Sequence, residues 1–440
     1  MSRPLLAIVL LAAVLRFGLL AAAYPEAARV LREDSIGSYV PLSHTLLSHG
    51  RFAEKPDAAP DIFRTPGYPV FLAATIAVAG DSIWRSLVAQ VLVSLGTIVL
   101  VYLLAREVVA ERAAAAAALV AAIDPPSNTH AVVMLTETVF TFLFAFACLA
   151  VCRAVRARSA SWAAAAGLAM GLSILVRPIA LYVGPLLALF AAVACPPPAP
   201  RRLLLGALVL ALSLAPPLAW MARNASIGAG FLLSSIEGAN LLFYRAAPVL
   251  ARARGIPWQQ AMDELNAEVV RRVGNAPRYG VAAAAASKRL ALEIVLAHPL
   301  GTAAMIAEGT VRFWAAPGNA DLMLLLGVTE LGHEARWPER GPPDARAAGW
   351  LLGVVAQLVH VAILAAALCG LVAWARPPRW PELAFTLGLL TAFTLLSAGP
   401  GAYARFRVPV VPLIALLVAA AYERRLSRAA LFFAGGEGRL

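Results

Sequence analysis

The clearest shortage in this 440-residue chain is charge, because only 14% of its residues are charged while 61% are hydrophobic. A soluble domain averages about 25% charged and about 45–50% apolar residues, so this chain has too little polar surface to cover itself in water. The mean hydropathy of +0.76 agrees with this reading. The composition therefore excludes an ordinary soluble protein and predicts an integral membrane protein.

Lysine is nearly absent as well, since only Lys55 and Lys288 stand among 37 basic residues. Arginine therefore supplies almost all of the net charge of +12. In a soluble protein such a charge would suggest nucleic acid, but a membrane protein carries it in cytoplasmic loops beside anionic headgroups. The arginine bias also fits a GC-rich bacterial genome. We expect membrane lipids as partners and no nucleic acid.

The sequence also lacks the short motifs of several enzyme classes. It has no GxxxxGK[ST], GxGxxG, HExxH or GxSxG, so nothing indicates a nucleotide loop, a zincin or a serine hydrolase. The six histidines lack ligand spacing, so no metal site is predicted, although a divalent metal held across separate loops stays open. The cysteines lie in apolar stretches and are interpreted as small buried hydrophobes, without a disulfide framework. They are Cys148, Cys152, Cys195 and Cys369.

Long unbroken apolar runs are what the chain has in abundance, and they predict helices rather than the alternating strands of a β-barrel. Strong runs cover 5–23, 84–105, 131–152, 160–176, 179–195, 203–221, 349–374, 382–398 and 408–422. A weaker, alanine-rich run covers 113–127, and 67–79 is too short to span comfortably. The first run is long for a signal peptide and is interrupted by Arg16, so it is interpreted as a retained span.

The arginines between these runs predict the topology, because short cytoplasmic loops are enriched in Lys and Arg. The relevant clusters are Arg153, Arg156 and Arg158; Arg201 and Arg202; Arg376 and Arg379; and Arg424, Arg425 and Arg428. They fall on one side only if 67–79 does not cross. The fold class expected is an all-α polytopic membrane protein with about ten spans and both termini in the cytoplasm. The segment 67–79 then forms a juxtamembrane or re-entrant helix outside.

Two long loops emerge on the outer side and divide the chain. Residues 1–221 form an N-terminal transmembrane catalytic module that includes the first external loop, 24–83. Residues 222–348 form a second external region with amphipathic helices, one of them at 258–273, where apolar residues recur at helical spacing. Residues 349–440 hold the last transmembrane helices and a cytoplasmic tail.

With this topology, the unusual polar residues gather at the outer face. They are Glu33, Asp34, Arg64, Glu137, Arg177, Arg223, Arg405 and Arg407. Taken singly, an arginine at a helix end is most often a snorkelling anchor, and Asp34 could be a solvated loop carboxylate. Glu137 is different, because a carboxylate inside a membrane helix costs about 2.5 kcal/mol or more and is functional by default. Together, the carboxylates and arginines predict a cleft that holds an anion, phosphate above all, beside a general base.

The order of these residues resembles a known family. The first external loop resembles that of GT-C glycosyltransferases, in particular the group of protein O-mannosyltransferases and the bacterial aminoarabinose transferase. The matching motifs are Asp34-Ser35-x-x-x-Tyr39, His49-Gly50-Arg51-Phe52, Arg64-Thr65-Pro66-Gly67-Tyr68-Pro69, Gly80-Asp81, Asp124-Pro125, Thr136-Glu137, Leu175-Val176-Arg177-Pro178, Arg223-Asn224 and Tyr403-x-Arg405-Phe406-Arg407-x-Pro409-x-x-Pro412. The resemblance spans about residues 5–420, but 222–348 shows no clear family pattern.

This resemblance implies transfer of a sugar from a polyprenyl-phosphate carrier to a lipid, glycan or protein acceptor outside the bacterial cytoplasmic membrane, with inversion. It implies that Asp34 is the catalytic acidic residue. The order Glu33-Asp34 departs from many relatives, which have Asp followed by Glu, so Glu33 is a second candidate. Glu137 is the third.

The same resemblance implies that a set of tyrosines and arginines lines the donor and phosphate site. They are Tyr39, Arg64, Tyr68, Arg177, Arg223, Arg405 and Arg407. The alternatives are a secondary transporter or lipid flippase, for which ionisable residues near the membrane midplane would be expected, and a non-catalytic assembly protein of the same fold.

Overall fold

The computed structural model describes residues 2–274, 280–328, 343–375, 380–399, 401 and 404–436, and in residues 343–346 and 426–436 it describes the backbone alone. Within these ranges every regular element is helical. Arg376, Arg379 and Tyr403, which the sequence analysis singled out, lie outside the described residues, and Arg428 lies in a backbone-only stretch.

The first half of the chain contains α1 (Arg3–Ala23), α2 (Ala27–Val30), the π-helix η1 (Ser35–Tyr39), α3 (Val40–His49), α4 (Gly67–Ala79), α5 (Ile83–Arg106), α6 (Glu111–Ile123), α7 (Pro125–Val132), α8 (Glu137–Ala157), α9 (Ala160–Val176), η2 (Pro178–Tyr182), α10 (Gly184–Ala194) and α11 (Ala199–Ser226). The second half contains α12 (Ile236–Leu241), η3 (Leu242–Ala246), α13 (Ala247–Arg254), α14 (Trp258–Val273), α15 (Val281–Ala297), α16 (Pro299–Ala315), α17 (Asn319–Leu325), α18 (Pro343–Trp374), α19 (Trp380–Ser397), η4 (Ala404–Val410) and α20 (Val411–Gly436).

The predicted all-α polytopic architecture is confirmed, with fewer full-length spans than the ten expected. Seven helices in the described part of the chain are long and apolar enough to cross a membrane, and an eighth is reached if α15 and α16, bent by 101°, count as one. The runs 113–127, 160–176 and 179–195 do form helices, but these helices have fewer than 18 residues and are not among the seven. Asp124-Pro125 ends α6, because proline is disfavoured within a helix. Helix α9, with 17 residues, is about 26 Å long at about 1.5 Å per residue, at the lower limit for a span.

The short helix predicted at 67–79 and the amphipathic helix predicted at 258–273 both form with those bounds. Helix α4 covers Gly67–Ala79, and its 13 residues give about 20 Å, too short to cross the hydrocarbon. Helix α14 covers Trp258–Val273 and buries Ala261, Leu265 and Val269 on one face. That face packs into a small second core with η3, α13 and α15.

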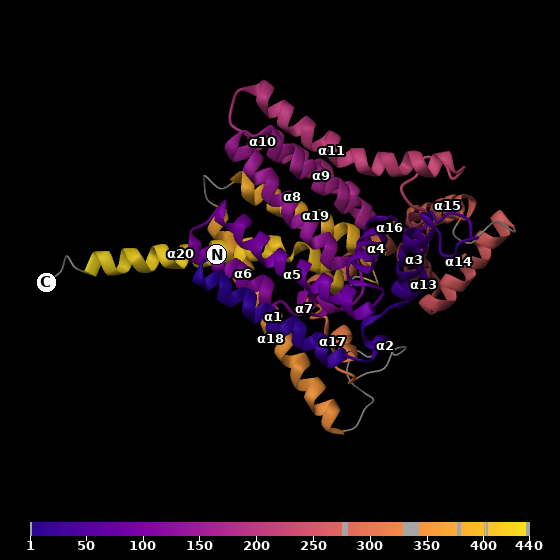
Figure 1. The fold of residues 1–440 in the computed structure, drawn as a ribbon, viewed down its shortest axis with the longest axis horizontal. Helices are drawn as coiled ribbons and strands as arrows, with labels where there is room; N and C mark the ends of the chain where they lie inside the picture. Colours follow the sequence, from indigo (N-terminus) through magenta and orange to yellow (C-terminus); the bar gives the residue numbers. More distant parts are fainter. Residues whose placement is uncertain are drawn as a thin grey trace.

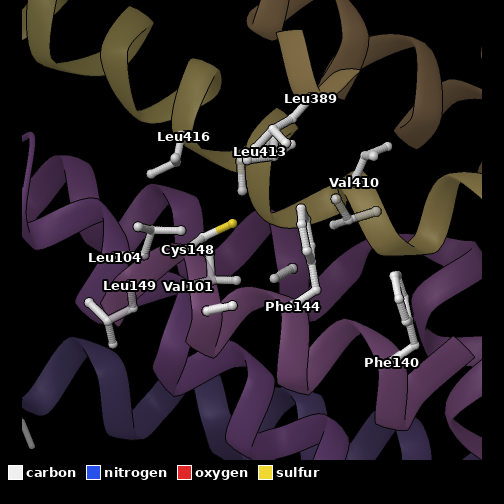
Figure 2. Close-up of a cluster of buried hydrophobic side chains, with 14 of the residues drawn as sticks. Val101, Leu104, Phe140, Phe144, Cys148, Leu149, Leu389, Val410, Leu413 and Leu416 are labelled. Atoms are coloured by element: carbon white, nitrogen blue, oxygen red, sulfur yellow. The ribbon is translucent and has the colours of Figure 1, made fainter. Parts of the chain in front are cut away.

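The main core lies around α8 and α20. In the most apolar windows of these helices 72% and 78% of residues are buried, against 22% in α1. Figure 2 shows side chains of α5 and α8, among them Phe140 and Phe144, facing side chains of α19 and α20. Phe144 makes an edge contact with Phe393 at a ring-centre distance of 5.3 Å. Helix α1 therefore sits at the rim of the bundle and α8 at its centre.

Most helices of the two long loops collect at one end of the bundle. In Figure 1, α3, α13, α14 and α15 lie at the right, whereas the start of α1 and the end of α20 lie toward the left. The second core just described belongs to this right-hand end. Asp34 and Arg64, which precede α3 and α4, are therefore carried by segments that lead into this loop-bearing end of the molecule.

Candidate active site

Asp34 lies directly before η1, outside the first membrane helix, and its carboxylate faces the guanidinium group of Arg64. Arg64 Nη2 donates to Asp34 Oδ1 over 2.5 Å. Arg64 Nη1 donates to the Tyr39 hydroxyl over 3.4 Å, and the Arg64 guanidinium carbon lies 5.0 Å from the Tyr39 ring centre. The Asp34 side chain is 36% exposed, so this carboxylate is open to a substrate.

The environment of Arg64 keeps this guanidinium group charged. Burial by itself would lower the pKa of Arg64, but Tyr39, Asp34 and Asp61 raise it more, so its pKa lies above the ordinary value. Burial raises the pKa of the Tyr39 phenol, which therefore stays neutral. The loop between α1 and α5 thus presents a permanent cation beside an accessible carboxylate.

Glu137, the first residue of α8, lies beneath this pair and is almost fully buried. Arg177 Nη1 lies 2.6 Å from Glu137 Oε1, and Arg405 Nε lies 3.5 Å from the same oxygen. Arg405 Nη2 also lies 4.0 Å from Asp34 Oδ2. Arg405 therefore stands between the exposed and the buried carboxylate and joins them into one arginine–carboxylate cluster of Asp34, Arg64, Glu137, Arg177 and Arg405.

Each member of the cluster lies at or near the end of a helical element, and five elements contribute. They are η1, the loop before α4, α8, the residue after α9, and η4. Three guanidinium groups face two carboxylates, which leaves one net positive charge. An excess of guanidinium groups in fixed positions favours binding of a phosphate, which arginine can grip in bidentate geometry.

The loop that carries Arg64 is held from both sides. The Arg64 backbone N–H donates to Asp61 Oδ1 over 2.8 Å, and Arg223 Nη1 donates to the Asp61 carbonyl over 3.0 Å. Gly67 packs so closely on the end of α9 that an added Cβ would lie 2.7 Å from the Leu175 backbone. The loop and the first turn of α4 are thereby pressed against the helix that ends at Arg177.

Four of the predicted residues lie apart from the cluster. Glu33 is exposed, and no ion pair joins it to another described residue. Tyr68 is fully buried and donates to Gln90 Oε1 over 2.7 Å. Arg223 stacks on Trp220 with its guanidinium carbon 4.6 Å from the ring centre.

Arg407 is buried as well, and its contacts are structural in kind. It donates to the carbonyls of Phe313, at 2.5 Å, and Ala316, at 2.8 Å. These two carbonyl groups belong to the last turn of α16 and to the residue that follows it. In this structure Arg407 therefore holds a helix end, and its guanidinium group does not face the cluster.

The structure also shows functional-site neighbours that the sequence analysis did not single out. Gln90 in α5 donates to the carbonyls of Ala131 and Val133, which shape the turn before Glu137. An amide in an apolar run is the signal that would have pointed to it. His130 and Asp321 meet beside the cluster, and since they are 191 positions apart in the sequence, no local pattern links them.

An apolar groove of about 350 Å³ lies beside η1. Ile36, Val40 and Ile83 line it, and His44 and Glu54 supply polar groups. Ile83 is the first residue of α5, which is long and apolar enough to cross a membrane, so the groove lies at the end of that helix. Among the described residues there is no group of three or more His, Cys, Asp or Glu side chains arranged to hold a metal ion.

Comparisons with known proteins agree with the family resemblance. A family model described as dolichyl-phosphate-mannose-protein mannosyltransferase matches residues 63–220, a segment that contains Arg64, Glu137 and Arg177. No curated protein gives a significant match.

Solved structures give the fold. The archaeal oligosaccharyltransferase AglB from Archaeoglobus fulgidus, in complex with an inhibitory peptide and a dolichol-phosphate, aligns with a TM-score of 0.57 at 16% identity, over 99% of this chain and 51% of that chain. Its apo form gives a TM-score of 0.56 at 18% identity over the same shares. ArnT from Cupriavidus metallidurans in the apo state gives 0.44 at 18% identity, over 94% and 78%. The chain spans about half the length of the AglB chain.

The helical bundle and the family match define the class: this is a multi-pass membrane protein with the fold of the GT-C glycosyltransferases. The fold is therefore similar to that of a glycosyltransferase, and the resemblance inferred from the motifs is confirmed at the level of the fold.

Proposed function

We propose that the protein is a membrane glycosyltransferase that moves a sugar from a polyprenyl-phosphate donor to an acceptor outside a bacterial cytoplasmic membrane, with inversion at the anomeric carbon. The arginine–carboxylate cluster at the loop-bearing end of a GT-C fold carries this proposal. The AglB structure with a dolichol-phosphate supports the carrier class, since that protein has the same fold.

The arginines suit a phosphate leaving group. As the bond between sugar and phosphate breaks, negative charge grows on the phosphate oxygens, and fixed cations lower the barrier by stabilising it. The side chain of Arg405 is 29% exposed, whereas Arg177 is 13% and Arg64 11% exposed. Arg405 is therefore assigned to direct contact with the phosphate, and Arg64 and Arg177 to its flanks.

Asp34 suits the role of general base. In a single displacement the acceptor oxygen attacks the anomeric carbon, its proton passes to Asp34, and the carrier phosphate leaves with the bonding electron pair. The exposure of Asp34 allows this contact, whereas Glu137 is 1% exposed and is assigned to positioning Arg177 and Arg405. Exposed Glu33, next in sequence, is the alternative base.

The groove beside η1 supports a lipid substrate. Its apolar side chains lie where a chain in the outer part of the membrane could reach them, and Ile36 is two residues from Asp34. The second external region, 222–348, is the proposed site of acceptor choice, with the acceptor a lipid, a glycan or a protein.

The test is a transfer assay with the purified full-length protein. It would be incubated in proteoliposomes with a panel of radiolabelled polyprenyl-phosphate sugars and membrane extract, and the product identified by mass spectrometry. Asp34→Asn should lower transfer by about 10²–10⁴-fold, the usual contribution of a general base. The matched control is Asp57→Asn, an exposed carboxylate of the same loop. Transfer that survives in Asp34→Asn moves the base to Glu33, and labelled lipid that crosses the bilayer without a product favours a flippase.

A further inference from the structure

A short helix of the second external region is built into the wall of the proposed site. Helix α17 packs against α7, α2 and α1, and it buries Met323 and Leu325. Gly318, directly before it, has a φ of +84°, and a Cβ there would lie 3.0 Å from the Ala404 side chain and 3.2 Å from that of Pro126. The chain therefore enters α17 through a turn that fits closely between α7 and η4.

Asp321, in the first turn of α17, is held by two cationic side chains from the N-terminal module. Arg32 donates to Asp321 Oδ1 from Nη2 over 2.8 Å and from Nε over 3.2 Å. His130 Nε2 lies 3.5 Å from Asp321 Oδ2. Burial would raise the pKa of Asp321, but His130 and Arg32 lower it more, so its pKa lies below the ordinary value and the carboxylate stays ionised.

The hydrogen bond that His130 makes through Nδ1 indicates the charge of the ring, since it fixes Nε2 as the nitrogen that faces Asp321. His130 Nδ1 lies 2.9 Å from the Pro126 carbonyl, which can only accept, so Nδ1 carries a proton. A neutral ring would then turn the lone pair of Nε2 toward the Asp321 carboxylate, which is repulsive. Burial would lower the pKa of His130, but Asp321 raises it more, which favours an imidazolium between α7 and α17.

The two partners of Asp321 lie in the two segments of the chain that carry the carboxylates of the cluster. Arg32 is two residues before Asp34, and its carbonyl accepts from the backbone N–H groups of Ser35, at 2.8 Å, and Ile36, at 3.0 Å. The His130 carbonyl accepts from Thr138 Oγ1 over 2.9 Å, at the residue after Glu137. Movement of Asp321 would therefore reach both carboxylates.

We infer that Asp321 is a positioning residue of the active site, which locks the Asp34 loop to the segment before Glu137 and makes α17 of the second external region a part of the catalytic module. This role rests on the proposed transferase function. It also gives the second region a task in catalysis besides acceptor choice, because the productive spacing of Asp34 and Arg405 depends on α17 being docked.

The experiment compares Asp321→Asn with Asp263→Asn, a matched control in α14, whose carboxylate is exposed and accepts from Gln259 on its own helix. Two readouts are taken on the full-length protein in nanodiscs. The first is steady-state transfer, separated into kcat and the KM for the lipid donor. The second is hydrogen–deuterium exchange of the peptides that cover 30–40 and 125–135.

We expect Asp321→Asn to lower kcat by about 10- to 100-fold, the scale of a misplacement of about 1 Å in an active site. The donor KM should stay within about threefold, because Asp321 is not expected to touch the donor, and exchange should rise in 30–40. Asp263→Asn should change neither. Arg32→Gln should mimic the loss, and the double variant should lose little more than either single one, since both act through one ion pair.

The outcomes separate the inference from the function. If the wild-type protein transfers a sugar and Asp321→Asn keeps its kcat, the positioning role is overturned. If the wild-type protein transfers nothing, the proposed function fails. Unchanged exchange in 30–40 would then overturn the anchoring role as well, and faster exchange in Asp321→Asn but not in Asp263→Asn would support it. Asp321→Glu, which keeps the charge, should recover part of kcat.

Discussion

Replacement of Glu137 by glutamine tests the buried half of the arginine–carboxylate cluster most directly. Glu137 is 1% exposed and faces Arg177 at 2.6 Å and Arg405 at 3.5 Å. Breaking a buried ion pair by removing one partner costs about 3–5 kcal/mol, because the other charge is left without compensation. The glutamine carbonyl can still accept from Arg177, which recovers about 1 kcal/mol. Arg405 is partly exposed and better screened by solvent, so the loss of its contact with Glu137 adds less to this cost than the loss of the contact with Arg177. We expect a net loss of about 2–4 kcal/mol of unfolding free energy.

The measurement is unfolding in mixed micelles with increasing SDS, followed by the fluorescence of the nine tryptophans. The matched control is Glu237→Gln, which removes a pair with Lys288, at 3.0 Å, between side chains that are 47% and 49% exposed. Exposed pairs contribute about 0–1 kcal/mol, so this variant should stay within that range.

A double-variant cycle gives the refuting result. If Glu137 and Arg177 stabilise each other, Glu137→Gln combined with Arg177→Met should cost clearly less than the sum of the single variants, by about 0.5–3 kcal/mol. Strict additivity, or equal losses in Glu137→Gln and Glu237→Gln, would show that the buried pair is not a stabilising contact and would remove the stated reason for the position of Arg405.

Three further predictions follow from the same region. Arg64→Ala should raise the donor KM by about 10- to 100-fold, because a hydrogen bond to a charged group contributes about 1.5–3 kcal/mol; an unchanged KM and kcat would place Arg64 outside the site. Gly67→Ala should destabilise the protein by about 1–3 kcal/mol through the clash with the Leu175 backbone, while Gly18→Ala in α1, with nothing within 4 Å, should be neutral; equal thermal stability of the two would contradict the close packing. In a background without the native cysteines, Ala59→Cys should react with an impermeant maleimide added outside cells and Ala157→Cys only after lysis; the reverse pattern would invert the proposed orientation.

Much of the fold could be predicted from the sequence because membrane helices obey a local rule. Each must satisfy its own backbone hydrogen bonds within about 20 apolar residues, so composition along the chain is enough to find them. The predicted 67–79 and 258–273 helices appear as α4 and α14 with the same bounds. The span count was less predictable, since α6 and α10 lie in apolar runs whose prolines shorten the helices. Local hydropathy does not show how deep a short helix sits.

The candidate site, too, could be predicted from the sequence only in part. Asp34, Arg64, Glu137, Arg177 and Arg405 stand out in the sequence because a charge at the end of an apolar helix is conspicuous, and the structure brings these five together. Arg407 looks the same in sequence, but it faces the end of α16, because side chains two residues apart on a tight helical turn point in different directions. Which arginine faces the site depends on the packing of η4.

The low charge of the sequence and the placement of its few charged residues determined the environment of this protein, its helical class and the face on which its polar residues gather. Only the tertiary structure decided which charges meet. The pairing of Arg32, His130 and Asp321 joins three segments that no local pattern connects, and it forms because buried charges must find partners that the fold alone can bring within reach.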